Sequence, residues 1–221
     1  MVALASRTVL APARTLRLLA PALALACAHS SSPAAVVPAP AAHWLATWTA
    51  PQAPANPRPP ADSVDATATW TDRTVREIVH TSIGGDRVRI RVSNEYGDQA
   101  LVIDAAHVAV RDTGDAIVTA TDRALTFGGR SMLTLRPGAA AVSDAVAFPV
   151  PATSEVAVSL HIAAPARVAT RHGLAMQRNY LSPSGDFSGA QVFTPESTFS
   201  AVPFLAGVDV ANDRATGVIV A

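Results

Sequence analysis

The 221-residue chain contains no lysine and only one cysteine, Cys27. A single cysteine excludes an internal disulfide framework and a zinc site built on several cysteines. Charged residues make up only 15% of the chain, and its 17 arginines are balanced by 17 acidic residues. Zero net charge argues against a dedicated nucleic-acid-binding protein, because such proteins normally carry an excess of positive charge. We therefore expect no nucleic-acid partner.

Hydrophobic residues, in contrast, form 49% of the chain, and the mean hydropathy is +0.26. These values exclude a disordered polyelectrolyte. The length is sufficient for one or two domains with a sizeable buried core.

Residues 1–28 have the composition of an export signal. Three arginines precede a short apolar run at 18–26, and small residues follow it. The run is too short to cross a bilayer as a helix, so we predict no transmembrane span. Cys27, directly after the run, is a candidate site for a lipid anchor, although Ala24 stands where a lipobox usually has leucine. We predict an exported protein, secreted or attached to the cell envelope, with a Ser/Pro/Ala linker at 29–42.

From residue 43 onward the sequence alternates with a period of two, which is typical of half-buried strands. Over 87–92, arginine alternates with valine or isoleucine and predicts a strand with an arginine face toward water. Before it lies a second strand pattern. It places Val75, Glu77, Val79, Thr81 and Ile83 on one face and Arg76, Ile78, His80 and Ser82 on the other. The turn residues 84–86 (Gly-Gly-Asp) lie between the two segments and predict a β-hairpin.

Further strands are expected where turn signals bound short apolar or alternating segments. They are 100–110, 117–119, 124–127, 131–135, 142–148, 155–162 and 204–210. Many short strands at this spacing, with no sustained helical period, predict a mainly β fold for 43–215. We expect an antiparallel β-sandwich or jelly-roll-like domain.

The last segment, 216–221, is apolar without alternation, as in a strand buried on both faces of a parallel sheet. Such a strand needs neighbours and a crossover helix, and none follows. We therefore expect it to be the first strand of an α/β domain that is missing from this chain.

The residues show no recognisable catalytic machinery. Gly-x-Ser-x-Gly is absent, and the nearest combinations of glycine and serine surround Ser131 and Ser184 in ordinary turn sequence. None of the six histidines forms a ligand pair. His107 and His161 lie within apolar strands, where we expect hydrogen-bonded and partly buried side chains, and His80 is expected to be exposed. From the residues alone we predict no catalytic residue, no cofactor and no metal.

Two polar groups are weaker candidates for ligand binding. Asp209, Asn212 and Asp213 could supply oxygen ligands to calcium, although three such residues in a loop are more often turn chemistry. The arginines of 87–92 could bind phosphate or an anionic polysaccharide, but a solvated strand face is the favoured interpretation.

Trp44, Trp48 and Trp70 are candidates for a ligand-binding or domain-packing face. Trp44 and Trp48 are four residues apart, so on a regular strand they share a face and could stack on a sugar. Packing against the sandwich or a neighbouring domain is the favoured interpretation.

Several long blocks, in the same order, resemble the N-terminal region of secreted bacterial SGNH hydrolases (GDSL-type lipases and esterases). They are HWLATWTAPQ (43–52), TVREIVHTSIGGD (74–86), RIRVSNEYG (89–97), ALTFGG (124–129) and FLAGVDV (204–210). In that family this region is a β-rich domain ahead of an α/β catalytic domain, and 218–221 is similar to the strand that leads into the Gly-Asp-Ser nucleophile block. The resemblance implies acyl- or acetyl-ester hydrolysis for a complete protein.

The same resemblance implies that this chain is itself inactive. The Gly-Asp-Ser block and the late Asp-x-x-His of the family are missing here, so no catalytic residue of the family maps onto this sequence. An ester or polysaccharide substrate is expected only through the missing catalytic domain. The alternative is a free-standing secreted β-sandwich module that binds cell-wall or plant polysaccharide.

Overall fold

A computed structural model describes residues 42–55, 64 and 67–215. The predicted export signal at 1–28, with Cys27, lies outside the described residues. So do all but the last residue of the predicted linker 29–42 and the predicted strand at 216–221.

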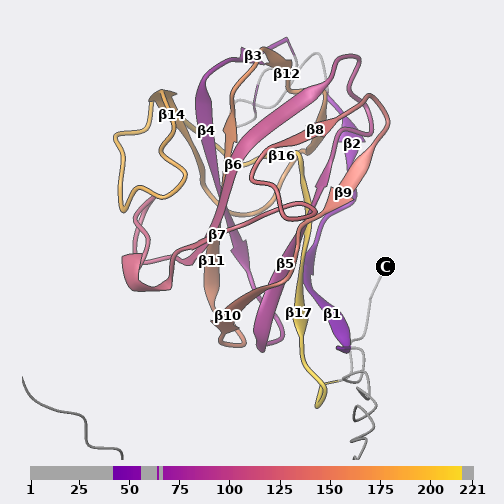
Figure 1. Cartoon of the computed structure of the whole chain (residues 1–221). Helices are drawn as coiled ribbons and strands as arrows, with labels where there is room; N and C mark the ends of the chain where they lie inside the picture. The colour runs from indigo at the N-terminus through magenta and orange to yellow at the C-terminus, as the bar shows by residue number, and fades with distance from the viewer. Residues whose placement is uncertain (1–41, 56–63, 65–66, 216–221) are drawn as a thin grey trace, which may run out of the picture. The chain divides into compact units, whose positions relative to one another are not determined.

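Two antiparallel sheets face each other and form a β-sandwich, as the alternating sequence predicted (Figure 1). The five-stranded sheet runs β1 (Trp44–Thr49), β17 (Leu205–Ala211), β5 (Gly85–Ser93) and β10 (Val146–Val150), with β9 (Ala140–Val142) also paired to β5. The seven-stranded sheet runs β15 (Ser197–Phe199), β14 (Asn179–Ser184), β4 (Arg73–His80), β11 (Glu155–Ile162), β6 (Leu101–Val110) and β7 (Arg123–Ala124), with β8 (Leu133–Leu135) also paired to β6.

Shorter pairings complete the described fold. β12 (Ala166–Arg167) pairs with β3 (Thr69–Trp70), and β13 (Thr170–His172) lies between β16 (Val202–Pro203) and β2 (Ala53–Pro54). One 3-10 turn, η1 (Thr119–Thr121), is the only helical element in the described ranges. Accordingly, no helix long and apolar enough to cross a membrane is found in this part of the chain.

The main core lies between the two sheets and is built from the inward residues of the alternating strands. On β5 these are Val88, Ile90 and Val92, and on β11 they include Val158 and Leu160, all fully buried. A second, smaller apolar cluster lies on the other face of the seven-stranded sheet, where it includes Ile78, Ala157, Tyr180 and Phe193. The seven-stranded sheet is therefore covered on both faces.

The predicted hairpin between β4 and β5 is wrong. β4 pairs with β11 and β14 in one sheet, whereas β5 pairs with β17, β10 and β9 in the other. The connection between them carries the chain from layer to layer, and Ser82 and Ile83 in it bond to Thr47 of β1. Gly85 lets the backbone lie close to Ala211 and does not form a tight turn, because a Cβ at this position would lie 2.5 Å from the Ala211 carbonyl oxygen.

Several of the shorter strands also have other bounds in the structure than the sequence predicted. The strand expected over 142–148 is divided between β9 and β10, and Asp144 in the gap is held by the Thr126 hydroxyl and by the backbone N–H groups of Gly128 and Gly129. These bonds hold the segment after β7 against the β9–β10 connection, so only Arg123–Ala124 joins a sheet there. The longer predictions agree with β6, β11 and β17 to within one residue at each end.

Candidate functional site

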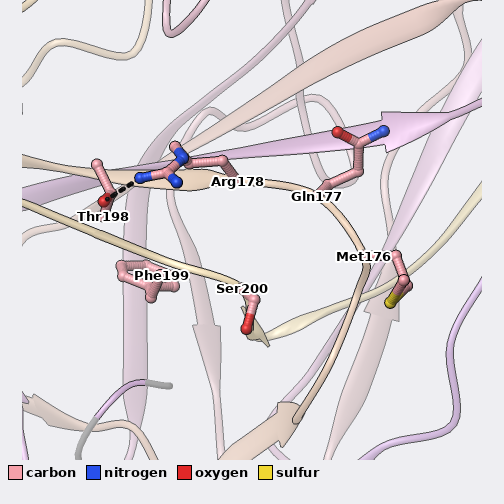
Figure 2. A pocket seen from close by; sticks show the side chains of 6 residues that line it. All are labelled: Met176, Gln177, Arg178, Thr198, Phe199 and Ser200. Carbon is pink, nitrogen blue, oxygen red and sulfur yellow. Dashed lines mark hydrogen bonds between the residues drawn. The ribbon is translucent and has the colours of Figure 1, made fainter. Parts of the chain in front are cut away.

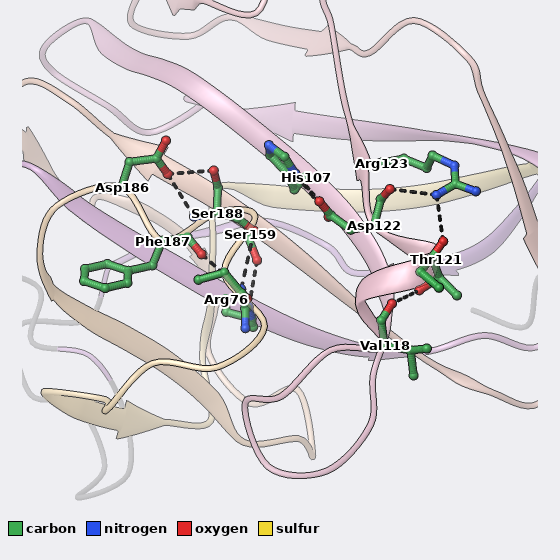
Figure 3. A network of polar contacts seen from close by, with 12 residues as sticks. Arg76, His107, Val118, Thr121, Asp122, Arg123, Ser159, Asp186, Phe187 and Ser188 are labelled. Carbon is green, nitrogen blue, oxygen red and sulfur yellow. Dashed lines mark hydrogen bonds and ion pairs between the residues drawn. The ribbon is translucent and has the colours of Figure 1, made fainter.

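Arg76 lies at the centre of the most extensive polar network, on the outer face of the seven-stranded sheet (Figure 3). Its Nε donates to Ser159 Oγ at 2.9 Å, and Nη1 donates to the Asp115 carbonyl oxygen at 2.6 Å. Nη2 donates to the carbonyl oxygens of Phe187 at 3.0 Å and Ala190 at 2.7 Å. A side chain on β4 thus ties down two loops, 111–118 and 185–193, that cover this face of the sheet.

The charge of Arg76 is retained although the side chain is fully buried. Burial lowers the pKa of Arg76 to about 10, while Asp115 and Asp122 act in the opposite direction. The guanidinium carbon also lies 4.9 Å from the centre of the Phe193 ring, a cation–π distance. The arginine is therefore a cation at neutral pH, and carbonyl oxygens, rather than a directly paired carboxylate, accept most of its hydrogen bonds.

His107 and Asp122 form a pair beside the hydrogen-bond network of Arg76. His107 Nδ1 lies 2.9 Å from Asp122 Oδ2, and both side chains are partly buried. Arg123 donates to the Asp122 carbonyl oxygen at 2.7 Å (Figure 3). The expectation that His107 is hydrogen-bonded and partly buried is confirmed.

A second histidine, His161 on β11, lies between two carboxylates. Its Nδ1 is 2.6 Å from Asp104 Oδ1, and its Nε2 is 3.2 Å from Asp72 Oδ1. Asp72 also accepts a hydrogen bond from the Ser184 hydroxyl. Four separate segments therefore meet in one chain of polar contacts, Ser184–Asp72–His161–Asp104, which the sequence predicted only as a hydrogen-bonded His161.

This chain of contacts does not form a Ser-His-Asp triad. In a triad the serine hydroxyl bonds to the imidazole, which takes its proton, whereas Ser184 bonds to a carboxylate. Ser131, the other serine considered, is exposed, and its side chain makes no hydrogen bond to any of the histidines that the structure describes. In the described ranges, no group of three histidine, cysteine or acidic side chains is arranged to hold a metal ion.

Replacing Ser184 by alanine is expected to raise the pKa of Asp72. The Ser184 hydroxyl is the main cause that holds this pKa below its ordinary value, and His161 acts in the same direction. A lowered pKa stabilises the fold above the ordinary aspartate pKa, and this contribution is lost as the pH falls through the folded value. A carboxyl-detected NMR titration should therefore give a higher Asp72 pKa in S184A than in the parent, with S131A as the matched control. An unchanged value would contradict the role assigned to Ser184.

The three tryptophans do not form a common face. Trp70 is 6% exposed and packs against Phe199 and Phe204, with ring centres 5.8 and 6.3 Å away. Trp48 packs against the main core, whereas Trp44 lies on the outer face of the five-stranded sheet. The prediction that Trp44 and Trp48 share a face is wrong because β1 has a bulge between Ala46 and Trp48, which reverses the alternation.

The polar candidates near the C-terminal end of β17 are engaged with protein groups. Asp209 contacts two arginines of β5, Asn212 donates to the Gly84 carbonyl oxygen at 2.7 Å, and Asp213 accepts from the His43 N–H at 3.2 Å. Asn212 and Asp213 border an open cleft of about 670 Å³ that also contains Arg214 and the Gly84–Arg87 backbone. The structure does not bring the three oxygen-bearing side chains together as a calcium site.

A smaller pocket, of about 170 Å³, lies between β14, β15 and the loop before β14 (Figure 2). It is lined by Met176, Gln177, Arg178, Thr198, Phe199 and Ser200. Arg178 Nη1 donates to Thr198 Oγ1 at 3.1 Å, and Gln177 donates to Glu155 at 2.9 Å. Sequence reasoning did not identify this pocket, whose residues carry no motif.

Sequence reasoning also missed a buried carboxyl group. Glu77 on β4 is fully buried and faces the main core, and neither of its oxygens has a hydrogen-bond partner in the described structure. Burial raises the pKa of Glu77 well above its ordinary value. The sequence signal for this burial was the position of Glu77 between Val75 and Val79, at every second residue of β4.

Comparison with known proteins yields no identification: no family model matches the chain, and a search of the curated proteins finds no match.

Proposed function

We propose that residues 43–215 form the non-catalytic β-sandwich of an exported SGNH-type ester hydrolase, placed ahead of its catalytic domain. The complete protein would hydrolyse acyl or acetyl esters. In this assignment the described residues contribute structure, and the nucleophile belongs to a part of the protein beyond residue 221.

The observation that carries the proposal is where the family-like blocks lie in the fold. HWLATWTAPQ contains β1, FLAGVDV contains most of β17, and RIRVSNEYG contains most of β5. These strands are neighbours in the order β1-β17-β5, although more than a hundred residues separate the first two in sequence. The resemblance thus covers three adjacent strands of the five-stranded sheet, and a further block, TVREIVHTSIGGD, contains most of β4 in the seven-stranded sheet.

A second observation concerns the ALTFGG block. Its last two glycines donate their backbone N–H groups to Asp144, at 3.1 and 2.7 Å, and its threonine donates to the same carboxylate at 2.6 Å. The block therefore has a structural role in holding the β9–β10 connection. Such a role fits a supporting domain.

The proposal is tested by comparing two proteins from the same locus in hydrolysis of p-nitrophenyl acetate. One is the 221-residue chain, and the other is the product of the whole reading frame that continues past codon 221. We expect no hydrolysis above the blank for the first and turnover by the second, abolished when the serine of its Gly-Asp-Ser block is replaced by alanine.

Two results would refute the proposal. One is a genomic reading frame without a Gly-Asp-Ser block after codon 221. The other is turnover by the 221-residue chain itself that is lost in S184A or S131A, because this would place the nucleophile within the described residues.

A further inference from the structure

The outer face of the five-stranded sheet carries a row of three arginines. Arg87, Arg89 and Arg91 alternate with core residues on β5, so their side chains all point away from the core. Alternate residues on a strand lie about 6–7 Å apart, so the three arginines follow one another along the outer face of β5. Whereas two loops cover the outer face of the other sheet, Arg87 is exposed and the side chains of Arg89 and Arg91 are about one-third exposed, at 32% and 36%.

One buried carboxylate orients two of the three guanidinium groups. Asp209, on the neighbouring strand β17, is 8% exposed at its side chain and contacts Arg89 Nε at 3.1 Å and Arg91 Nη2 at 3.3 Å. A guanidinium has more N–H donors than one carboxylate oxygen takes up, so both arginines keep donors for a further acceptor. Three arginines against one aspartate leave this face with a positive charge.

Arg87 and Arg89 are also positioned by Trp44. The guanidinium carbon of Arg89 lies 4.4 Å from the centre of the Trp44 ring, and that of Arg87 lies 5.7 Å away. Arg87 makes no ion pair or side-chain hydrogen bond within the described part of the protein, so its full charge is available to a ligand. Trp44 is therefore a positioning residue, since Arg89 occupies a face of its ring.

Several residues that pair with the arginines or lie beside them on the outer face are small, namely Ala46, Ala147, Ala211 and Gly207. The larger neighbours on this face are Trp44, Asp209 and Val142. A Cβ at Gly207 would lie 2.4 Å from Arg91 Nη2, so the glycine lets the guanidinium lie close to the sheet. An extended polymer could therefore approach the row over its small neighbours, alongside the Trp44 ring.

We propose that the Arg87–Arg89–Arg91 row, oriented by Asp209 and Trp44, binds a polysaccharide that carries carboxylate groups. Guanidinium groups match carboxylates in charge and in hydrogen-bond geometry. An extended chain is favoured over a membrane surface because the exposed apolar side chain on these rows is a single valine, Val142. This inference is independent of the ester hydrolase proposal, because it concerns residues of this chain alone.

The test measures binding of the 221-residue chain to sodium polygalacturonate by isothermal titration calorimetry, with dextran as the neutral polymer. We expect binding to polygalacturonate and none to dextran, and we expect the affinity to fall as sodium chloride is raised from about 50 to about 500 mM, because salt screens exposed charges. In R87Q the affinity should fall by about two- to five-fold, as for loss of one exposed ion pair. This variant breaks no ion pair, so folding should be unaffected.

Two further variants separate a built site from general charge attraction. G207A keeps the net charge but displaces the Arg91 guanidinium, so it should also weaken binding. R130Q removes an exposed arginine elsewhere and should leave the affinity unchanged. The inference is overturned if polygalacturonate does not bind at low salt, if R130Q weakens binding as much as R87Q, or if the chain instead binds vesicles of phosphatidylglycerol and not the polymer.

Discussion

Replacing Glu77 by glutamine is expected to stabilise the protein, and the gain should grow as the pH rises above about 4.5, the ordinary glutamate pKa. The carboxyl group of Glu77 is fully buried among core valines and lacks a hydrogen-bond partner among the described residues. A buried polar group without a partner costs about 1–3 kcal/mol, and more when it is charged. Glutamine is also a polar group without a partner, but it has no proton to lose, so E77Q removes only the cost of keeping the carboxyl protonated. That cost is about 1.4 kcal/mol for each pH unit above the unfolded pKa, so at neutral pH we expect E77Q to raise the free energy of unfolding by about 1–3 kcal/mol.

The pH dependence follows from the direction of the pKa shift. Because burial raises the pKa of Glu77, the folded protein binds this proton more tightly than the unfolded chain does. The stability that this proton provides is complete below the unfolded pKa and is lost as the pH rises through the folded pKa. A glutamine at this position does not titrate, so the two proteins should differ least in acid and most at neutral pH.

The measurement is urea unfolding of the parent and E77Q at several pH values between about 4 and 8. E95Q is the matched control, because Glu95 is exposed, and it should follow the parent curve. A second variant, E77M, removes the polar group and should be at least as stable as E77Q if the core accepts its volume. Parallel stability curves for the parent and E77Q would contradict the assignment of Glu77 as a protonated core residue.

Much of the sandwich could be predicted from local alternation, and the pairing of its strands could not. The segments 87–92 and 155–162 have the period of a half-buried strand, which a single sequence displays directly. The partners of β5 are β17 and β10, which lie far away in sequence, and no local pattern indicates them. The Gly84-Gly85 pair therefore looked like a hairpin turn, although its glycines allow close approach to the ends of β10 and β17, the neighbours of β5 in its own sheet.

The tryptophan candidates failed for a related reason. A prediction that Trp44 and Trp48 share a face assumes a regular strand, and β1 contains a bulge between Ala46 and Trp48. Thr47, the residue between them, donates to the Ile83 carbonyl oxygen at 2.6 Å and accepts from the Ile83 N–H at 2.9 Å. This tertiary contact, which has no local sequence signal, accompanies the reversal of side-chain direction.

The sequence predicted that the two buried-strand histidines would be hydrogen-bonded, but it did not predict which residues would be their partners. Apolar neighbours around His107 and His161 predicted partly buried side chains that need hydrogen bonds. The structure confirms the hydrogen bonds of both and the partial burial of His107, whereas His161 is buried. The carboxylates that supply them come from loops and strands elsewhere in the chain. In the same way, the position of Glu77 on the apolar side of β4 was readable from alternation, whereas its lack of a partner depends on the packed core.

Replacing Arg76 by methionine is expected to have the largest destabilising effect. The guanidinium donates to Ser159 and to carbonyl oxygens in two covering loops, and its removal leaves these buried acceptors without a donor. Several unsatisfied groups together should lower the free energy of unfolding by about 3–5 kcal/mol. Amide hydrogen exchange should also become faster in the loops 111–118 and 185–193, because both lose the hydrogen bonds that Arg76 donates to them.

Lysine at position 76 should restore only part of the stability, since one ammonium group cannot reach acceptors on both loops and on Ser159 at once. R130Q is the control for loss of an arginine charge and should change stability little, because Arg130 is exposed. A loss below about 1 kcal/mol in R76M, or unchanged exchange in both loops, would contradict the role assigned to Arg76.

Arg76 and Glu77 together distinguish the effect of burying an ionisable group from the effect of its hydrogen bonds on stability. They are adjacent on β4, both are fully buried, and they point to opposite faces of one sheet. Each side-chain nitrogen of the arginine donates a hydrogen bond, whereas neither carboxyl oxygen of the glutamate has a partner among the residues that the structure describes. If burial of an ionisable group alone decided stability, R76M and E77Q would shift the free energy of unfolding in the same direction. We expect opposite signs, because R76M leaves buried acceptors without their donor, whereas E77Q removes an ionisable group that has no hydrogen bond to lose.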